Sequence, residues 1–161
     1  FNRTKLGLGL QVLRADVDLG AVVADEVEQL RGAYPHARLE LATTGAIRGR
    51  WDGRRLQQLL RNLVLNAIRY GARDTAIRVR LHGGPAEVRL EVTNSGPAIA
   101  ASDLSQIFDP LKRASAVDGG QEDRGLGLGL YIVREIVHAH AGSIEVRCEG
   151  GETTFAVRLP R

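Results

Sequence analysis

Two asparagines and an arginine share one face of the most regular amphipathic segment in the sequence. Asn62, Asn66 and Arg69 are spaced i, i+4 and i+7, so in a helix they project within about 60° of one another. Amide oxygens suit a hard cation, and a guanidinium suits phosphate oxygens. Tyr70 lies at the edge of this group. The spacing is typical either of a cation and phosphate site or of an ordinary solvated helix face.

A second polar segment, VTNSGPAIA at 92–100, ends a run of alternating residues. Asn, Ser, Gly and Pro are all turn residues, so on its own the segment indicates a turn. The functional alternative makes Asn94 a polar group that reads the edge of a flat ligand. Gly96 would then let that ligand approach the backbone.

The third segment is the string GLGLGL at 125–130. Gly125, Gly127 and Gly129 precede residues with helical spacing that stop at Gly142. Glycines at the N-terminus of a helix would expose backbone N–H groups and the positive end of the helix dipole, which favours an anion. The same letters at 6–10 precede no comparable helix. We interpret the first copy as a linker and the second as a phosphate site.

Helices and strands must position these three segments. Periodicity and end signals predict helices at 18–34, 53–70 and 101–108, and a last helix that follows the three glycines and ends before Gly142. They predict strands at 38–44, 46–52, 76–82, 86–92, 143–148 and 153–159, and a polar loop at 109–124. Asp52 and Gly71 bound the second helix as cap and stop. This order predicts an α+β two-layer sandwich, with a mixed, mostly antiparallel sheet of about five strands and three main helices on one face.

Composition excludes several classes of protein. With 161 residues, 43% of them hydrophobic and 25% charged, the chain is expected to form one globular domain. The net charge is +3, but the basic residues are scattered and only 4% of residues are aromatic, so we expect no nucleic-acid partner. Cys148 is the single cysteine, which excludes a disulfide framework. Since the chain has no methionine, we expect it to be a fragment of a longer protein.

Taken together and in this order, the segments resemble the ATP-binding catalytic domain of sensor histidine kinases, in the superfamily that includes Hsp90, type II topoisomerases and MutL. LQQLLRNLVLNAIRYGA is similar to the N box of that family, VTNSGPAI to its first glycine box, IFDPL to its phenylalanine box, and GLGLGLYIVREIVHAHAGSIEV to its second glycine box with the helix and strand that follow. The resemblance spans roughly 15–160 and implies the Bergerat-type fold of this superfamily.

The resemblance implies a role for each matching position. Asn66 would ligate Mg²⁺, Asn62 and Arg69 would lie near the phosphates, Tyr70 would flank the nucleotide, and Asn94 would occupy the place of the adenine-reading aspartate. The other ATP-binding positions that it implies are Gly96, Ile99, Phe108, Lys112, Arg124, Gly125, Leu126, Gly127, Leu128, Gly129 and Leu130, with the loop 109–124 as the ATP lid.

The chain departs from the family pattern at the first glycine box and the phenylalanine box. The usual DxGxG is here NSGPA, with Asn94 for the aspartate and Ala98 for the second glycine, and Leu111 replaces an aromatic residue. A neutral amide accepts a hydrogen bond less strongly than a carboxylate. The N-x-G-P-x-I variant resembles a subset of kinases that includes the bacterial phytochromes.

Two absences refine the implied mechanism. Relatives that hydrolyse ATP carry a glutamate base one turn before the Mg²⁺ ligand, and this position is Asn62 here, so hydrolysis is expected to be negligible. The family's phosphoacceptor histidine sits in a separate helical domain. The four histidines of this chain, at positions 36, 82, 138 and 140, are expected to be structural or surface residues.

The resemblance therefore implies a histidine kinase catalytic domain at 15–161, with 1–14 as a linker or the end of an upstream domain. It would bind ATP and Mg²⁺ and donate the γ-phosphate to a histidine on the upstream dimerisation domain in two-component signalling. A response regulator would be an indirect partner, and the parent would be a homodimer with this domain in the cytoplasm, whether soluble or membrane-anchored. The alternative is a degenerate nucleotide-binding or purely regulatory module without kinase activity.

Overall fold

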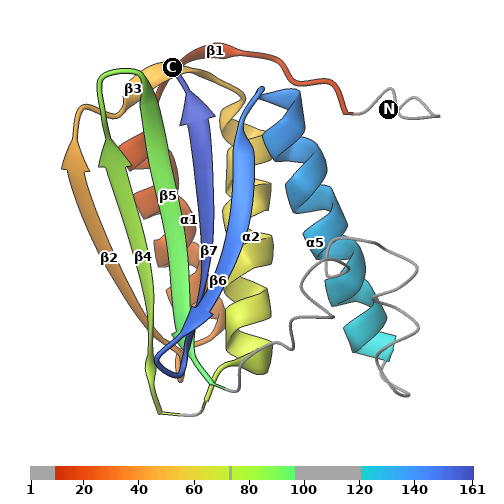
Figure 1. Ribbon diagram of the computed structural model, residues 1–161. Coiled ribbons are helices and arrows are strands. Elements are labelled where there is room, and N and C mark those ends of the chain that lie inside the picture. The colour runs from red at the N-terminus through yellow and green to blue at the C-terminus, as the bar shows by residue number, and fades with distance from the viewer. Residues whose placement is uncertain (1–9, 73, 97–120) are drawn as a thin grey trace.

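The chain folds into two layers, a sheet and a set of helices that covers one of its faces (Figure 1). The computed structural model describes residues 10–72, 74–96 and 121–161, with the backbone alone for 121–128. The elements are β1 (Ala15–Asp18), α1 (Leu19–Ala33), β2 (Arg38–Gly45), β3 (Arg48–Trp51), α2 (Gly53–Tyr70), β4 (Ala76–Gly83), β5 (Glu87–Ser95), α5 (Gln121–Ala139), β6 (Ser143–Glu149) and β7 (Glu152–Pro160). The expected α+β sandwich is confirmed, whereas the helix expected at 101–108 lies outside the described residues.

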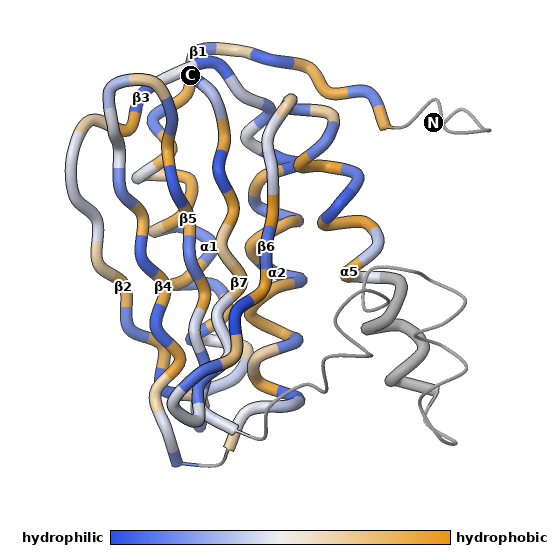
Figure 2. The backbone as a smooth tube through the Cα atoms, viewed as in Figure 1, coloured by the Kyte–Doolittle hydropathy of each residue, from blue (hydrophilic) through white to orange (hydrophobic). Residues whose placement is uncertain are grey.

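The main sheet has the strand order β2-β4-β5-β7-β6, in which β2 and β4 are parallel and the other neighbours are antiparallel. Hydropathy alternates along its central strands (Figure 2). In β5, Val88, Leu90 and Val92 are buried in the core while Arg89 is exposed. Because successive side chains point to opposite faces, one face packs on the helices and the other stays open.

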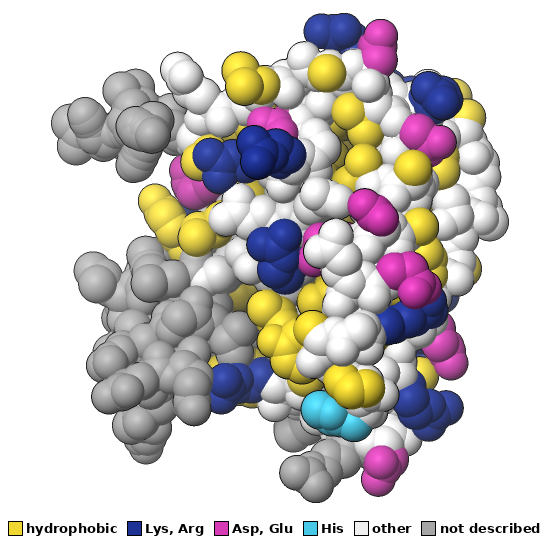
Figure 3. Space-filling view, turned by 180° about the vertical axis from the view of Figure 1, so that it is seen from behind, with side chains coloured by type: hydrophobic (Ala, Val, Ile, Leu, Met, Phe, Trp, Pro, Cys, Tyr) yellow, Lys and Arg dark blue, Asp and Glu magenta, His cyan; other side chains and the backbone are white. Residues whose placement is uncertain are grey.

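Charges of both signs are spread over the helical side of the molecule. Seen from behind, arginine and acidic side chains are interspersed with hydrophobic ones, and basic groups do not gather in one area of this face (Figure 3). None of the helices in the described part of the chain is long and apolar enough to cross a lipid bilayer.

Helix α2 lies between α1 and α5 and forms the centre of the helical layer. Its apolar stripe is buried completely, with relative exposures of 0–2% at Leu56, Leu59, Leu60, Leu63, Val64 and Ala67. Both helices that follow an aspartate begin as expected. The Asp18 carboxylate accepts from the Ala21 N–H at the start of α1, and that of Asp52 accepts from the Arg55 N–H at the start of α2.

A two-stranded sheet at one end of the domain was not predicted. Residues 15–18 pair antiparallel with 48–51, with Ala15 opposite Trp51. The four residues of β1 are too few for a period-two signal, and the pairing joins residues that are 30 to 36 positions apart in the chain. Trp51 is buried, and its indole N–H donates to the Pro160 carbonyl at 3.0 Å. The incoming chain is therefore fixed beside the start of α2.

The expected boundary of the last helix is wrong. Gly125, Gly127 and Gly129 were expected to precede it, but α5 begins at Gln121 and includes all three glycines. Residues 121–124 are correspondingly helical rather than the end of the loop 109–124. The first four N–H groups of a helix lack partners within it, so the free N–H groups of α5 belong to 121–124 and not to the glycines.

A buried histidine joins the end of α5 to the start of α2. The Nε2 atom of His140 accepts from the Asp52 N–H at 3.0 Å, so the proton lies on Nδ1, which donates to the Ile136 carbonyl at 2.9 Å. The Asp52 carboxylate also accepts from the Leu13 N–H at 2.9 Å, and the Arg14 guanidinium donates to the Ala139 carbonyl. His140 is thus structural, as expected, and serves in its neutral form.

This arrangement predicts acid sensitivity of the fold. Burial lowers the pKa of His140 below the ordinary 6.5, opposed in part by its bond to Ile136. The stability that neutral His140 contributes is present above pH 6.5 and is lost as pH falls towards the lower pKa of the folded state. The slope for one proton is at most about 1.4 kcal/mol per pH unit. We expect His140→Gln to flatten the dependence of the free energy of unfolding on pH below pH 6.5.

The matched control is His138→Gln, since His138 is an exposed residue of the last turn of α5. Denaturant unfolding at a series of pH values measures the slopes. Equal slopes for the wild type and His140→Gln would contradict the assignment.

Candidate functional site

Asn66 is a buried polar residue with an unsatisfied acceptor. Its side chain is 5% exposed, and its Oδ1 atom has no hydrogen-bond partner among the residues that the structure describes. Leaving a buried acceptor unpaired costs about 1–3 kcal/mol, so an apolar residue would serve the fold better. Amide oxygens are good ligands for Mg²⁺. The observation therefore fits the expected metal ligand and does not fit a solvated helix face.

Asn62 lies one turn before Asn66 and connects two helices. Its Nδ2 group donates to the Gly129 carbonyl in α5 at 3.3 Å. A Cβ atom added at Gly129 would lie 3.5 Å from Cγ of Asn62, which shows how closely α5 approaches α2 here. Asn62 is half-buried, and its amide holds the backbone of α5 at Gly129 against α2.

Asn94 faces the helical layer at the end of β5. It follows Val92 on the buried face and is 6% exposed. Its Nδ2 group donates to the Ser95 carbonyl at 3.3 Å. This bond orients the amide. Oδ1 and the second N–H of the amide are then available to a ligand.

Gly71 belongs to the site in a way that sequence reasoning missed. A Cβ atom there would lie 2.6 Å from the Ala67 carbonyl oxygen and 3.3 Å from Nδ2 of Asn94. We predicted Gly71 only as the residue that stops α2. Its position directly after Tyr70, at the end of the N box, is the feature of the sequence that could have suggested a place in the site. The contact with Asn94 is tertiary, so the local sequence does not show it.

The ends of α2 and β5 meet at Gly96. A Cβ atom at Gly96 would lie 3.0 Å from the Tyr70 carbonyl oxygen, and its φ of +155° is unusual for other residues. The Ala72 N–H donates to the Ser95 carbonyl at 2.6 Å beside this contact. The structure therefore brings together the N box and the first glycine box, as their joint resemblance implies.

Arg69 and Tyr70 are exposed side chains in the last turn of α2. Arg69 borders a hollow of about 570 Å³ that is also lined by His36, Arg38 and Asp74. Neither Asn66 nor Asn94 lines this hollow. It lies beside the expected site rather than within it.

The remaining expected positions fall into three groups. Ile99, Phe108, Lys112 and the loop up to residue 120 lie outside the described residues. For Arg124, Gly125, Leu126, Gly127 and Leu128 the structure describes helical backbone only. Leu130 is 2% exposed and belongs to the hydrophobic core, so its side chain packs inside the domain.

Comparison with known proteins adds an independent finding. Residues 51–161 match the family described as histidine kinase-, DNA gyrase B-, and HSP90-like ATPase. Over 160 residues the chain is 36% identical to a bacteriophytochrome of Pseudomonas aeruginosa, a match that covers 99% of this chain and 22% of that protein. Over 159 residues it is 31% identical to the histidine protein kinase DivJ of Caulobacter vibrioides, covering 98% of this chain and 24% of DivJ.

Solved structures show the same fold. The nucleotide-free catalytic domain of the histidine kinase ThkA superposes with a TM-score of 0.78 at 24% identity, covering 92% of this chain and 96% of that one. The chain spans about a quarter of the length of the two curated relatives.

The unsatisfied oxygen of Asn66 generates a prediction that separates function from folding. Replacing an unpaired buried acceptor removes a cost, so Asn66→Ala should keep the free energy of unfolding within about 1 kcal/mol of the wild type. It should weaken Mg²⁺-dependent ATP binding by tenfold or more, on the order of 1.4 kcal/mol for a lost ligand. Denaturant unfolding and calorimetric titration with and without Mg²⁺ measure the two effects.

Asn66→Asp is the matched variant, since it keeps an oxygen ligand for the cation. A large loss of stability in Asn66→Ala with undiminished ATP affinity would make Asn66 a structural residue.

Proposed function

The chain belongs to the histidine kinase-, DNA gyrase B-, and HSP90-like ATPase family, and we propose that it is the ATP-binding catalytic domain of a sensor histidine kinase. It would bind Mg·ATP and donate the γ-phosphate to a histidine on a separate upstream dimerisation domain. The observation that carries this proposal is the buried, unpaired Oδ1 of Asn66, in the helix whose end meets Asn94 and Gly96. The match to a histidine protein kinase over 98% of the chain supports it.

Three side chains would bind and position the nucleotide, each in a different way. Asn66 would ligate Mg²⁺, which when bound neutralises charge on the transferring phosphate. Asn62 would hold the glycine segment through its bond to Gly129. Asn94 would accept a hydrogen bond from the adenine amino group through Oδ1, while its bond to the Ser95 carbonyl orients the amide. These residues position and bind the nucleotide, which is most of what phosphoryl transfer requires of a protein.

Water is not expected to compete as the acceptor. The place of a general base one turn before Asn66 is taken by Asn62, whose amide cannot remove a proton and is bonded to α5. His140 uses both ring nitrogens within the fold. The Nδ1 atom of His82 is hydrogen-bonded to the Thr44 hydroxyl on the sheet. The acceptor histidine would therefore come from outside this chain.

The organisation of the parent protein is part of the proposal. Residues 1–14 would connect an upstream helical domain to the catalytic domain at 15–161. The parent would act as a homodimer with this domain in the cytoplasm, and a response regulator would receive the phosphate from the upstream histidine.

The second candidate is a degenerate module that binds nucleotide weakly and transmits conformation. The amide of Asn94 favours it, because the position lacks the charge that strengthens a hydrogen bond to adenine. ATP affinity and nucleotide selectivity distinguish the two candidates.

Asn94 is therefore expected to control base selectivity. Asn94→Ala should lose most adenine recognition, whereas Asn94→Asp should sharpen the preference for ATP over GTP by on the order of 1–2 kcal/mol, the gain of a charge-assisted hydrogen bond. A carboxylate repels the guanine oxygen, whereas an amide can rotate towards it by giving up its bond to Ser95. Titration of both nucleotides at one Mg²⁺ concentration measures the effect. Equal binding of both by the wild type and Asn94→Ala would favour the degenerate module.

The isolated chain should bind ATP without consuming it. It lacks a water-activating carboxylate at the position of Asn62, and its histidines are expected to be structural or surface residues rather than the acceptor, so radiolabelled ATP should yield neither free phosphate at an appreciable rate nor labelled protein. Introducing Asn62→Glu should raise hydrolysis if the position is the one from which a base acts. Rapid turnover by the wild type, or acid-labile phosphate on the chain, would show that an acceptor had been overlooked.

A further inference from the structure

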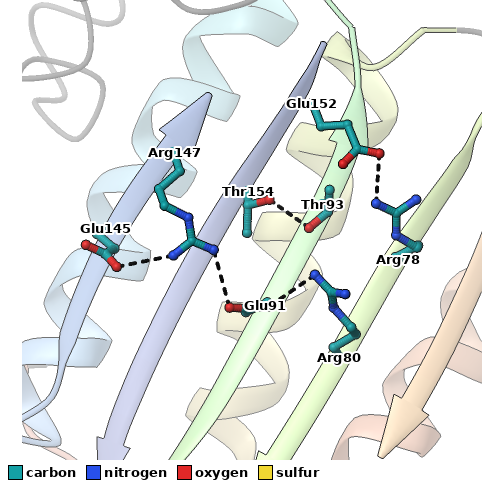
Figure 4. A network of polar contacts seen from close by, with 8 residues as sticks. All are labelled: Arg78, Arg80, Glu91, Thr93, Glu145, Arg147, Glu152 and Thr154. Atoms are coloured by element: carbon teal, nitrogen blue, oxygen red, sulfur yellow. Dashed lines mark hydrogen bonds and ion pairs between the residues drawn. The ribbon is translucent and has the colours of Figure 1, made fainter. Parts of the chain in front are cut away.

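The open face of the main sheet carries a network of paired charges. In Figure 4 the helices lie behind the sheet, and the labelled side chains point away from them. Arg78 pairs with Glu152 at 2.8 Å, and Arg80 and Arg147 pair with Glu91 at 3.3 and 3.5 Å. Across this part of the face each arginine stands beside an acid, which is the arrangement of a solvated sheet surface.

The next cross-strand row breaks this pattern. His82 of β4 stands opposite Arg89 of β5, and Arg89 stands opposite Arg158 of β7. Like charges directly opposite one another destabilise a sheet. The Nε atom of Arg158 lies 3.9 Å from a carboxylate oxygen of Glu87, which is a long ion pair. Arg89 is exposed and has no ion-pair partner in the described part of the chain. We call His82, Arg89 and Arg158 the basic row.

A hollow adjoins the basic row. It measures about 320 Å³ and is lined by Ala42, Thr44, Arg80, Leu81, His82, Arg89 and Glu91. The carboxylate of Glu91 is already paired with Arg80 and Arg147. The Thr44 hydroxyl lies 2.8 Å from Nδ1 of His82 and holds the imidazole ring in place. The Nε2 atom of His82 and the guanidinium of Arg89 are left for a partner that binds from solvent.

The basic row is separate from the candidate nucleotide site. It lies on the open face, near the turn between β4 and β5, whereas Asn94 faces the helices at the other end of β5. Arg89 precedes Asn94 by five residues, which in a strand is about 17 Å. A ligand on the row would leave the nucleotide site accessible.

We propose that the basic row is the docking site of an acidic protein segment. Neighbouring strands lie about 4.8 Å apart, and carboxylates at positions i and i+4 of a helix are separated by about 5–6 Å, so such a pair matches adjacent members of the row. Single exposed ion pairs are weak, and a free anion in so open a hollow gains little. An acidic segment that pairs with two or three residues of the basic row at once sums the small free energies of these single ion pairs. The like-charged pair, unfavourable in the isolated domain, is neutralised in the complex.

The test uses the 161-residue chain, labelled with ¹⁵N, and poly-L-glutamate as the probe. Titration at low salt should shift the amides of 80–91 and leave those around Asn66 unmoved. Arg89→Gln should weaken the affinity by about threefold to fivefold, the value of one exposed ion pair. The matched control is Arg54→Gln, an exposed arginine in the first turn of α2, which should leave the affinity unchanged.

Thermal unfolding is a second measurement, which separates specific docking from non-specific attraction between opposite charges. Arg89→Gln and Arg158→Gln should each raise the midpoint of thermal unfolding and lower the affinity for poly-L-glutamate. Each change removes one of two positive charges that repel each other in the folded domain and that attract the acidic probe. Equal loss of affinity in Arg89→Gln and Arg54→Gln would reduce the effect to non-specific attraction and overturn the proposal. Tighter binding of inorganic phosphate than of poly-L-glutamate at the same amides, or no shift at low salt, would overturn it as well.

Discussion

The burial of one helix face fixes the orientation on which the candidate site depends. Six apolar residues of α2 are buried in the core, so the helix cannot rotate without exposing them, at about 25 cal/mol for each Å² of apolar surface. Asn66 lies on the same helix at the margin of this stripe and is carried into the interior with its oxygen unpaired. Hydrophobic packing thus sets the position of a polar group that packing alone would not select.

Both ends of α2 are also tied to other elements. At its start, Asp52 accepts from the incoming chain at Leu13 and donates to His140 at the end of α5. At its end, Gly71 and Ala72 contact the last residues of β5. The middle of the helix holds α5 through Asn62 and Gly129. A movement of the incoming chain would therefore reach α2 and α5 through hydrogen bonds rather than through a loop.

Sequence reasoning succeeded where the signal was local and periodic, and failed where it was tertiary. The stripe of α2, its Asp52 cap and the alternation of β4 and β5 are patterns of a few neighbouring residues, and all are confirmed. The β1–β3 pairing and the contact of Gly71 with Asn94 join distant segments that no local pattern connects. Glycine lowers helix propensity by about 1 kcal/mol per residue, which is why α5 was expected to begin after its glycines. A Cβ atom at 129 would lie 3.5 Å from Cγ of Asn62, an ordinary van der Waals contact, so nothing in the structure explains the glycine at that position.

The central claim is that the unpaired oxygen of Asn66 holds the cation of a bound metal–nucleotide complex. Replacing Mg²⁺ by Mn²⁺ tests it most directly, because a paramagnetic ion broadens the NMR signals of nearby groups. With ATP and Mn²⁺ added to ¹⁵N-labelled chain, the side-chain amide of Asn66 should broaden first, at sub-stoichiometric Mn²⁺, while the Arg89 amide on the open face stays sharp. Broadening that spares Asn66, or that is the same without ATP, would contradict the assignment.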